Sequence, residues 1–250
     1  GPPLPPRAIL LTFDDGITTD MDIKPIFSSL RRSPTGAILV ALQIALALAI
    51  VVNSLFIIVQ RFEKVNRDPG VDVPNIFFVG WVPSSDSYQG EVTMREDLAV
   101  LRSLPGVAAA TVVNAVPLSG GGSSTSVFTE PNEKGRRADM NYFEVDEQGL
   151  DTFGVTLTEG RNFDATIVTK PPRNSSFSPS GILVTQDVAK ELFPKESALG
   201  KTIYTGTSQP VTILGIIDHM HGSWPGWDKV GNVGLFPVIP DETYARYMVR

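Results

Sequence analysis

The stretch that decides the architecture is AILVALQIALALAIVVNSLFIIV, residues 37–59. It contains 23 residues and no charged side chain. A helix of that length is about 34 Å long, enough to cross the hydrocarbon core of a bilayer. Fifteen of its residues are Leu, Ile, Val or Phe. Together they favour insertion by about 5 to 9 kcal/mol, which outweighs the cost of the two amides, Gln43 and Asn53. The sequence therefore predicts a transmembrane helix.

An apolar segment near an N-terminus can also be a cleaved signal peptide or a buried core helix. A signal peptide has an apolar region of only about 7 to 15 residues and a small-residue cleavage site. This run is longer and is followed by Gln60, Arg61 and Phe62. A buried helix needs apolar neighbours, and the remaining sequence contains no second helix that is apolar all round. We therefore favour a membrane span over residues 37–60.

Small side chains recur along the predicted span at intervals of four residues, at Ala37, Ala41, Ala45, Ala49 and Asn53. Such a row lets a second helix approach closely, and the amide at its end can hydrogen-bond across the interface. The row is therefore a candidate helix-packing surface. An alanine-rich helix also produces this spacing by chance, so both interpretations stay open.

The charges that flank the span do not decide its orientation. The three nearest basic residues on each side are Lys24, Arg31 and Arg32 before it and Arg61, Lys64 and Arg67 after it. Because the positive-inside rule compares these numbers, it gives no preference here.

The composition limits what the remaining chain does. About 180 of the 250 residues follow the span, which is sufficient for one sizeable or two small domains. From Arg67 onward, 15 Lys and Arg stand against 22 Asp and Glu, a net charge of −7. An acidic segment without a basic stripe is a poor partner for nucleic acid. The absence of cysteine excludes disulfides and thiolate metal sites.

Residues 1–20 differ in character from the rest of the chain. After a proline-rich start they contain AILLTFDDG, residues 8–16, an apolar strand that runs into two carboxylates and a glycine turn. This motif resembles the opening motif of polysaccharide deacetylases. The resemblance implies that Asp14 is a base and that Asp15 binds a metal together with two later histidines.

The histidines of this chain do not fit that metal site. His219 and His221 are its only two, and they lie about 200 residues downstream of the motif, across the predicted span. We therefore expect residues 1–20 to be an unrelated leader that is dispensable for folding. Residues 21–36 are predicted to be a short cytoplasmic juxtamembrane segment.

Beyond residue 67, strand-like and helix-like patterns alternate. Residues 94–104 place apolar side chains at helical spacing behind Thr93, a predicted N-cap, and Pro105 stops that helix. The predicted strands are 76–82, 107–116, 126–129, 140–145, 155–160, 181–185 and 211–217, and the other predicted helices are 148–153 and 187–193. The first strand, helix and strand predict a βαβ-like unit. The whole pattern predicts an α+β domain over residues 67–250, with two α+β subdomains.

Two clusters invite a binding-site interpretation. His219 and His221 alternate on an extended chain and could share a metal ion, but no third ligand is spaced to complete a site, so solvated loop histidines are favoured.

The glycine- and serine-rich residues 117–126 resemble a phosphate loop only superficially. A Walker motif needs Lys directly after its last glycine, where this chain has Ser123. We therefore predict a flexible loop there, and no ATP site.

The order of the segments resembles the permeases of the macrolide-exporter (MacB/FtsX-like) ABC family. The segments that carry the resemblance are LRR at 30–32, the span at 37–59, LPGV at 104–107, YF at 142–143, FGV at 153–155, EGRNF at 159–163, residues 184–193, ALGK at 198–201 and ILGIID at 213–218. Each motif is weak alone, but together they keep their order over about 200 residues.

The resemblance implies an N-terminal transmembrane helix that starts in the cytoplasm of a bacterium, then a large periplasmic core domain of α+β subdomains. Three further transmembrane helices follow in the family, so this chain is expected to be a fragment of a longer reading frame. The implied location is the bacterial inner membrane. The implied partners are an ABC ATPase subunit, a second permease copy and the lipid bilayer, with a periplasmic adaptor as a further candidate.

The resemblance also implies transmission rather than catalysis. ATP binding and hydrolysis on a partner subunit shift the membrane helices, and the periplasmic domain moves in response to release or gate a substrate. No catalytic residue and no cofactor is expected in this chain. The alternatives are a membrane-anchored periplasmic binding or sensor domain and, less favoured, a deacetylase built on Asp14 and Asp15.

Overall fold

The structure is a computed structural model that describes residues 34–81, 90–171, 179–241 and 243–250. The chain divides into two compact units, residues 1–63 and residues 64–250, and each is described by itself. Nearly all of the predicted leader and juxtamembrane segment, with Asp14 and Asp15, therefore lies outside the described residues.

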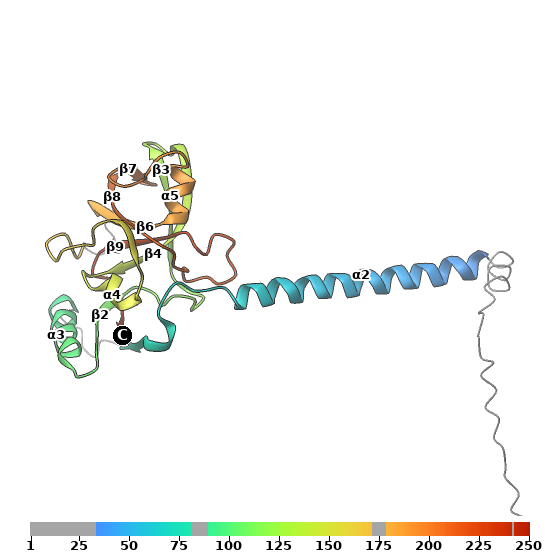
Figure 1. The fold of residues 1–250 in the computed structure, drawn as a ribbon, viewed down its shortest axis with the longest axis horizontal. Helices are drawn as coiled ribbons and strands as arrows, with labels where there is room; N and C mark the ends of the chain where they lie inside the picture. The colour runs from blue at the N-terminus through green and yellow to red at the C-terminus, as the bar shows by residue number, and fades with distance from the viewer. Residues whose placement is uncertain (1–33, 82–89, 172–178, 242) are drawn as a thin grey trace, which may run out of the picture. The chain divides into compact units, whose positions relative to one another are not determined.

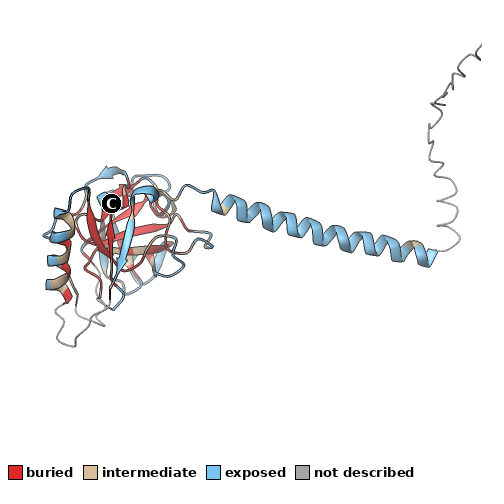
Figure 2. Ribbon diagram, turned by 90° about the horizontal axis from the view of Figure 1, so that it is seen from below, coloured by how far each residue is buried: buried red, intermediate tan, exposed pale blue. Residues whose placement is uncertain are grey.

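The apolar stretch forms helix α2 (Pro34–Val65), as the sequence predicts. None of its residues is buried, and Figure 2 shows the helix exposed along its length. It is long and apolar enough to cross a membrane, with a mean hydropathy of 2.6 over its best window. At 32 residues it measures about 48 Å, so it is longer than the roughly 30 Å hydrocarbon core. The helix continues past the apolar run through Arg61 and Lys64, cations that suit its C-terminal end.

The second unit combines two β-sheets with short helices (Figure 1). Its helical elements are the 3₁₀ turn η1 (Val73–Asn75), α3 (Gly90–Ser103), α4 (Gly149–Phe153) and α5 (Gln186–Leu192). Its strands are β1 (Phe77–Gly80), β2 (Ala110–Val113), β3 (Ser123–Glu130), β4 (Lys134–Val145), β5 (Leu157–Gly160), β6 (Gly181–Thr185), β7 (Thr202–Thr205), β8 (Pro210–Ile217), β9 (Val233–Pro237) and β10 (Arg246–Val249). The predicted α+β class is confirmed.

The smaller sheet has the strand order β1-β10-β2. Both β1 and β2 run antiparallel to β10, so they are parallel to each other with β10 between them. The predicted βαβ-like unit is therefore present, but it is split by a strand from the far end of the sequence. Met94 and Leu98 of α3 pack with Ala110, Val112 and other apolar side chains of this sheet in one core cluster.

The larger sheet closes on itself. Its order is β5-β8-β6-β9-β4-β3-β7, and β7 also pairs with β8, which makes a ring of six strands with β5 attached to β8. The β4–β9 and β6–β8 pairs are parallel and the other pairs are antiparallel. Helix α5 contributes Val188, Ala189 and Leu192 to the apolar cluster that these strands share.

Several predicted bounds are corrected. Helix α3 already includes Gly90, so Thr93 lies inside it rather than at its N-cap. An ion pair between Glu91 and Arg95, 3.1 Å apart, supports its first turns. Residues 123–125 lie in the predicted loop but belong to β3, because the strand pairs with β4 from Ser123 onward.

The sequence pattern does not predict three of the strands, β7, β9 and β10. Strand β4 is also longer than predicted, because its charged first half pairs with β3 along its length. The predicted loop at 170–180 lies mostly outside the described residues. The loop predicted at 117–126 is shortened to the residues that precede Ser123.

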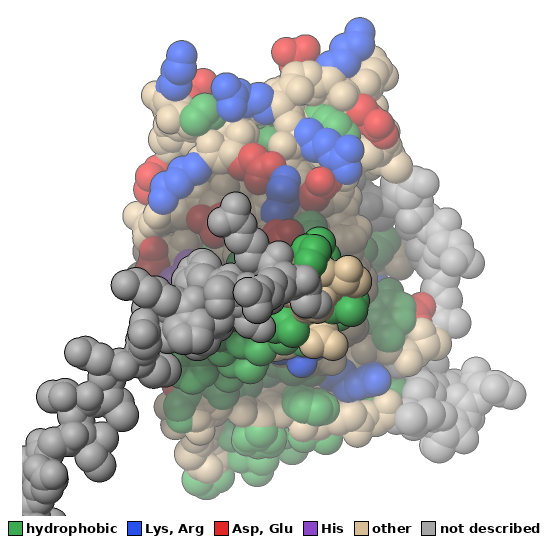
Figure 3. All heavy atoms as spheres, turned by 90° about the vertical axis from the view of Figure 1, so that its right-hand side faces the viewer, with side chains coloured by type: hydrophobic (Ala, Val, Ile, Leu, Met, Phe, Trp, Pro, Cys, Tyr) green, Lys and Arg blue, Asp and Glu red, His purple; other side chains and the backbone are tan. Residues whose placement is uncertain are grey.

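Strand β1 is an exposed edge of the smaller sheet. Phe77 and Phe78 are each 56% exposed and Val79 is 43% exposed. On the face seen in Figure 3, apolar side chains gather toward the end of this unit that carries the smaller sheet, and Lys, Arg, Asp and Glu gather toward the opposite end.

Candidate functional site

The two histidines singled out in the sequence lie directly after β8, where the chain leaves the larger sheet. His219 is half-exposed and stands between two carboxylates: Nε2 is 3.7 Å from Oδ2 of Asp68 and Nδ1 is 3.7 Å from Oδ2 of Asp218. The rings of His219 and His221 are nearly perpendicular, with centroids 6.5 Å apart. Burial, and next the charge of His219, lower the pKa of His221.

A metal centre is not assembled around them within the part of the chain that the structure describes. Nowhere in residues 34–81, 90–171, 179–241 and 243–250 do three or more His, Cys, Asp or Glu side chains come together as a metal would require. His219 instead faces Asp68, which belongs to the segment that follows α2. The loop that carries His219 and His221, which we call the histidine loop, is thus part of a contact between two segments that are distant in the sequence.

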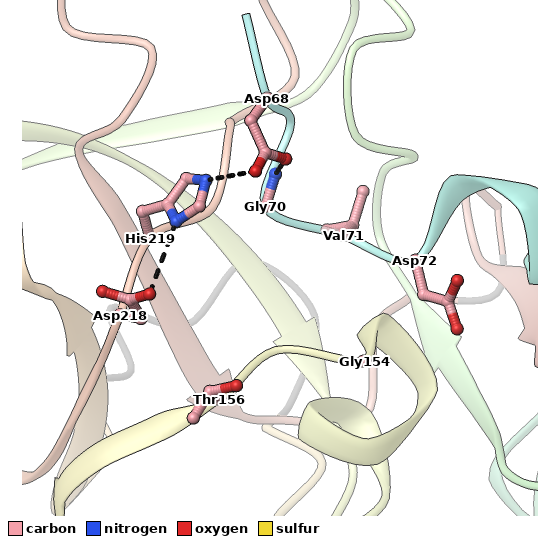
Figure 4. A pocket seen from close by; sticks show the side chains of 8 residues that line it. All are labelled: Asp68, Gly70, Val71, Asp72, Gly154, Thr156, Asp218 and His219. Carbon is pink, nitrogen blue, oxygen red and sulfur yellow. Dashed lines mark hydrogen bonds and ion pairs between the residues drawn. The ribbon is translucent and has the colours of Figure 1, made fainter.

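A cavity of about 240 Å³ lies at this contact (Figure 4). Its lining comes from three places in the sequence, the segment after α2, the turn after α4 and the end of β8, and consists of Asp68, Gly70, Val71, Asp72, Gly154, Thr156, Asp218 and His219. Three of these eight residues are aspartates, and Val71 is the one aliphatic side chain among them. The cavity therefore marks a joint between segments more than a pocket for an apolar ligand.

We call residues 68–76 the strap, because they run from just beyond the end of α2 across the domain surface. Its first half lies close against the histidine loop. The backbone N–H of His221 donates to the carbonyl of Pro69 at 2.9 Å. Gly70 has φ +71°, and a Cβ there would lie 2.4 Å from the carbonyl oxygen of His219. Asp68 accepts from the N–H of Gly70 at 3.0 Å, which stabilises this turn.

The second half of the strap is fixed at Asp72. Its backbone N–H donates to the carbonyl of Phe153 at 3.0 Å, and its Oδ2 lies 2.8 Å from Nε of Arg250. The hydrogen bond from Arg250, and next that from Asn75, hold the pKa of Asp72 below its ordinary value. Gly154, with φ +69°, passes so closely that a Cβ there would lie 2.8 Å from Cβ of Asp72.

Few apolar side chains of the strap take part in this contact. Val71 and Ile76 are partly buried against the core cluster that contains Phe143 and Phe153. The other links of the strap are hydrogen bonds and ion pairs at the surface. These contacts can hold the strap in place on the domain. Among the described residues around them, no nucleophile has an adjacent base.

The sequence located His219 but not its surroundings. In the sequence, Asp68, Gly70 and Asp72 have the residue types of turns and nothing more, and Arg250 gives no signal. Their partners lie more than 80 residues away in the sequence, so no local pattern connects them. A usable hint was the run DPG at 68–70, since glycine after a tight turn often marks a close backbone approach.

The small-residue row on α2 stays a prediction. Because α2 is one continuous helix, Ala37, Ala41, Ala45, Ala49 and Asn53 do follow one i, i+4 ridge. Such ridges are inclined by about 26° to the helix axis, so two helices that interdigitate along them cross at about 50°. Membrane helices that pack through small residues cross at about 40°.

The sequence of the chain identifies its family. The sequence model of the MacB-like periplasmic core domain matches residues 37–246. The chain therefore belongs to that family, and it carries the periplasmic core domain of a MacB-like ABC transporter permease. Comparison with curated proteins finds no match.

Two solved structures are similar to the chain. The extracellular domain of the noncanonic ABC-type transporter YknZ from Gram-positive bacteria is 18% identical, with a TM-score of 0.44, covering 70% of this chain and 83% of that one. The periplasmic region of MacB from Actinobacillus actinomycetemcomitans is 16% identical, with a TM-score of 0.45, covering 75% of this chain and 79% of that one.

Proposed function

We propose that the chain is part of the permease subunit of an ABC exporter in the bacterial inner membrane. In this proposal α2 crosses the membrane with its start in the cytoplasm, and the domain lies in the periplasm. ATP binding and hydrolysis occur on a separate ATPase subunit, and the periplasmic domain passes the resulting movement on to release or gate a substrate. A second permease copy and a periplasmic adaptor complete the expected assembly.

The observation that carries this proposal is the extent of the family match. It runs from residue 37 to residue 246, so it includes the apolar helix and the domain as one continuous unit. A binding domain that was merely anchored would not need a span and a domain of one family in this order. The strap supports transmission as well, because it fixes the residues just after α2 to the domain by specific contacts.

The proposal is tested by asking whether ATP moves the domain. Ser124 is exposed on β3, and the chain has no cysteine, so Ser124→Cys gives a single labelling site. In nanodiscs that contain two spin-labelled copies and a MacB-like ABC ATPase subunit, ATP is expected to shift the distance distribution between the labels. An ATPase whose Walker lysine is replaced is the control. A distribution that ignores ATP, or that shifts equally with the inactive ATPase, would contradict transmission.

The expected second copy gives a prediction for the alanine row. Ala45→Leu should push a neighbouring helix away and weaken association of two spans by roughly 1 kcal/mol, since small residues allow close helix contact. Leu46→Ala, one residue on and off the row, should have little effect. Association is measured by energy transfer between labelled copies in lipid vesicles. Equal losses for the two variants would show that the row is a coincidence of composition.

A further inference from the structure

The strap is held differently from the rest of the domain. The sheets are joined by ladders and by clusters of fully buried side chains such as Phe143 and Phe153. The strap has no buried residue. It is held by hydrogen bonds and ion pairs at the surface and by two of its own side chains, Val71 and Ile76, which are partly buried. Segments with few buried apolar contacts open at lower free energy than the core.

Its fit is nevertheless specific. Gly70 of the strap lies against the carbonyl of His219, and Gly154 of the domain lies against Asp72. Each contact is so close that a Cβ added to the glycine would collide. Two glycines in the left-handed region thus face the contact from opposite sides. Gly70 and Asp72 are only two positions apart, so a displacement of the strap at one of these contacts also moves the other.

We propose that the strap is a releasable joint, which detaches as one unit from the histidine loop and from the turn after α4 while the domain stays folded. This inference deepens the proposed function, on which its biological meaning rests. When seated, the strap leaves only Asn66 and Arg67 between the end of α2 and Asp68. When the strap is detached, residues 66–76 become a tether of up to about 36 Å, at about 3.3 Å per residue. The seated strap passes movement to the domain, and the detached strap absorbs it.

Hydrogen exchange can report detachment through amides on both sides of the contact. The N–H of His221, on the domain, bonds to Pro69 of the strap, and the N–H of Asp72, on the strap, bonds to Phe153 of the domain. The N–H of Gly222 is a matched control, because it is the next residue but bonds to Val230 within the domain at 2.7 Å. The full chain in nanodiscs is used, with fragmentation that resolves single residues.

The wild-type chain is expected to show equal protection at His221 and Asp72, and stronger protection at Gly222. Gly70→Ala introduces the collision with His219 and should speed exchange at His221 and Asp72 by about tenfold or more while Gly222 is unchanged. Gly200→Ala is the matched control, since Gly200 has φ +73° but nothing within 4 Å of the added Cβ. It should leave all three rates as they are.

Three outcomes would overturn the inference. If His221, Asp72 and Gly222 exchange at one rate in every variant, the strap opens only with the whole domain. If His221 and Asp72 respond separately, the strap is not one unit. If both are unprotected in the wild-type chain, it is not seated at all. Asp72→Asn, which removes the charge that pairs with Arg250, repeats the test should Gly70→Ala fail to fold. None of these measurements needs an ATPase, so their failure would leave the proposed function standing.

Discussion

Arg102→Ala should cost the domain about 3–5 kcal/mol of its free energy of unfolding, because it leaves a buried carboxylate without its counter-charge. Arg102, on α3, forms an ion pair with Asp146, whose side chain is only 4% exposed. The same guanidinium donates from Nε and Nη2 to the carbonyl of Ala110 at 2.9 and 2.7 Å. The guanidinium of Arg102 therefore links α3, which packs on the smaller sheet, to the end of β4 in the larger sheet.

Asp146 cannot compensate for the loss. Its other oxygen already accepts from Thr111 at 2.7 Å and from the N–H of Gln148 at 3.0 Å. Burial raises the pKa of Asp146, and the charge of Arg102 opposes that rise. Without Arg102, the cost of burial, the repulsion from the charge of Glu147 and these two hydrogen bonds remain.

The measurement is thermal and urea unfolding of the full chain, followed by near-UV circular dichroism. For a domain of this size the expected loss lowers Tm by about 6–20 °C. Arg95→Ala is the matched control, because Arg95 is on the same helix and pairs with Glu91 at 3.1 Å, but both side chains are more than 40% exposed. It should cost no more than about 0.5 kcal/mol. Equal losses for the two variants would show that the Arg102 pair is not the link described.

The elements that the sequence predicted well are those whose surroundings are implied by their own composition. Helix α2 could be predicted without a protein partner, because its run of 23 uncharged, mostly apolar residues favours a bilayer as its solvent. Strands β6 and β8 are nearly continuous apolar runs, so their pattern indicates burial on both faces. Helix α5 lies between turn signals and has its apolar residues at helical spacing.

The elements that were missed depend on partners far away in the sequence. Strand β10 has four residues and is fixed by β1 and β2, which lie more than 130 residues before it. The first half of β4 begins with Lys134 and contains Arg136 and Arg137, and it is a strand only because β3 pairs with it. The strap is a similar case, since the turn at Asp68 was visible but its contact with His219 was not.

Glu144→Gln should stabilise the domain at pH 8 by about 1–3 kcal/mol and change its stability little at pH 4.5. Glu144 lies on β4, and its Oε2 is buried without a hydrogen-bond partner among the described residues. Burial, and next the charge of Asp241, raise the pKa of Glu144 from 4.5 to about 7. Burial, and next the charge of Glu144, in turn raise the pKa of Tyr244 to about 12. The carboxylate form of Glu144 is thus disfavoured in the folded protein.

The direction of the pH effect follows from the two pKa values. At pH 4.5 Glu144 is protonated in the folded state and about half protonated in the unfolded state, and at lower pH it is protonated in both, so it imposes little penalty there. Between pH 4.5 and 7 the folded state retains a proton that the unfolded state releases, so stability falls as the pH rises. Above pH 7 the penalty is complete, at most about 3 kcal/mol for a rise of this size.

Glutamine has the shape of glutamic acid and stays neutral. It therefore removes this pH dependence of the free energy of unfolding and keeps the packing. Urea unfolding at pH 4.5, 6, 7 and 8 measures the effect, with Glu130→Gln, an exposed carboxylate on the adjacent strand β3, as the control. The difference between the Glu144 variant and the wild-type chain should grow between pH 4.5 and 7 and then become constant. A gain that is the same at every pH would mean that the amide adds a hydrogen bond of its own. No gain at pH 8 would mean that water or a cation already neutralises the cost of the buried carboxylate.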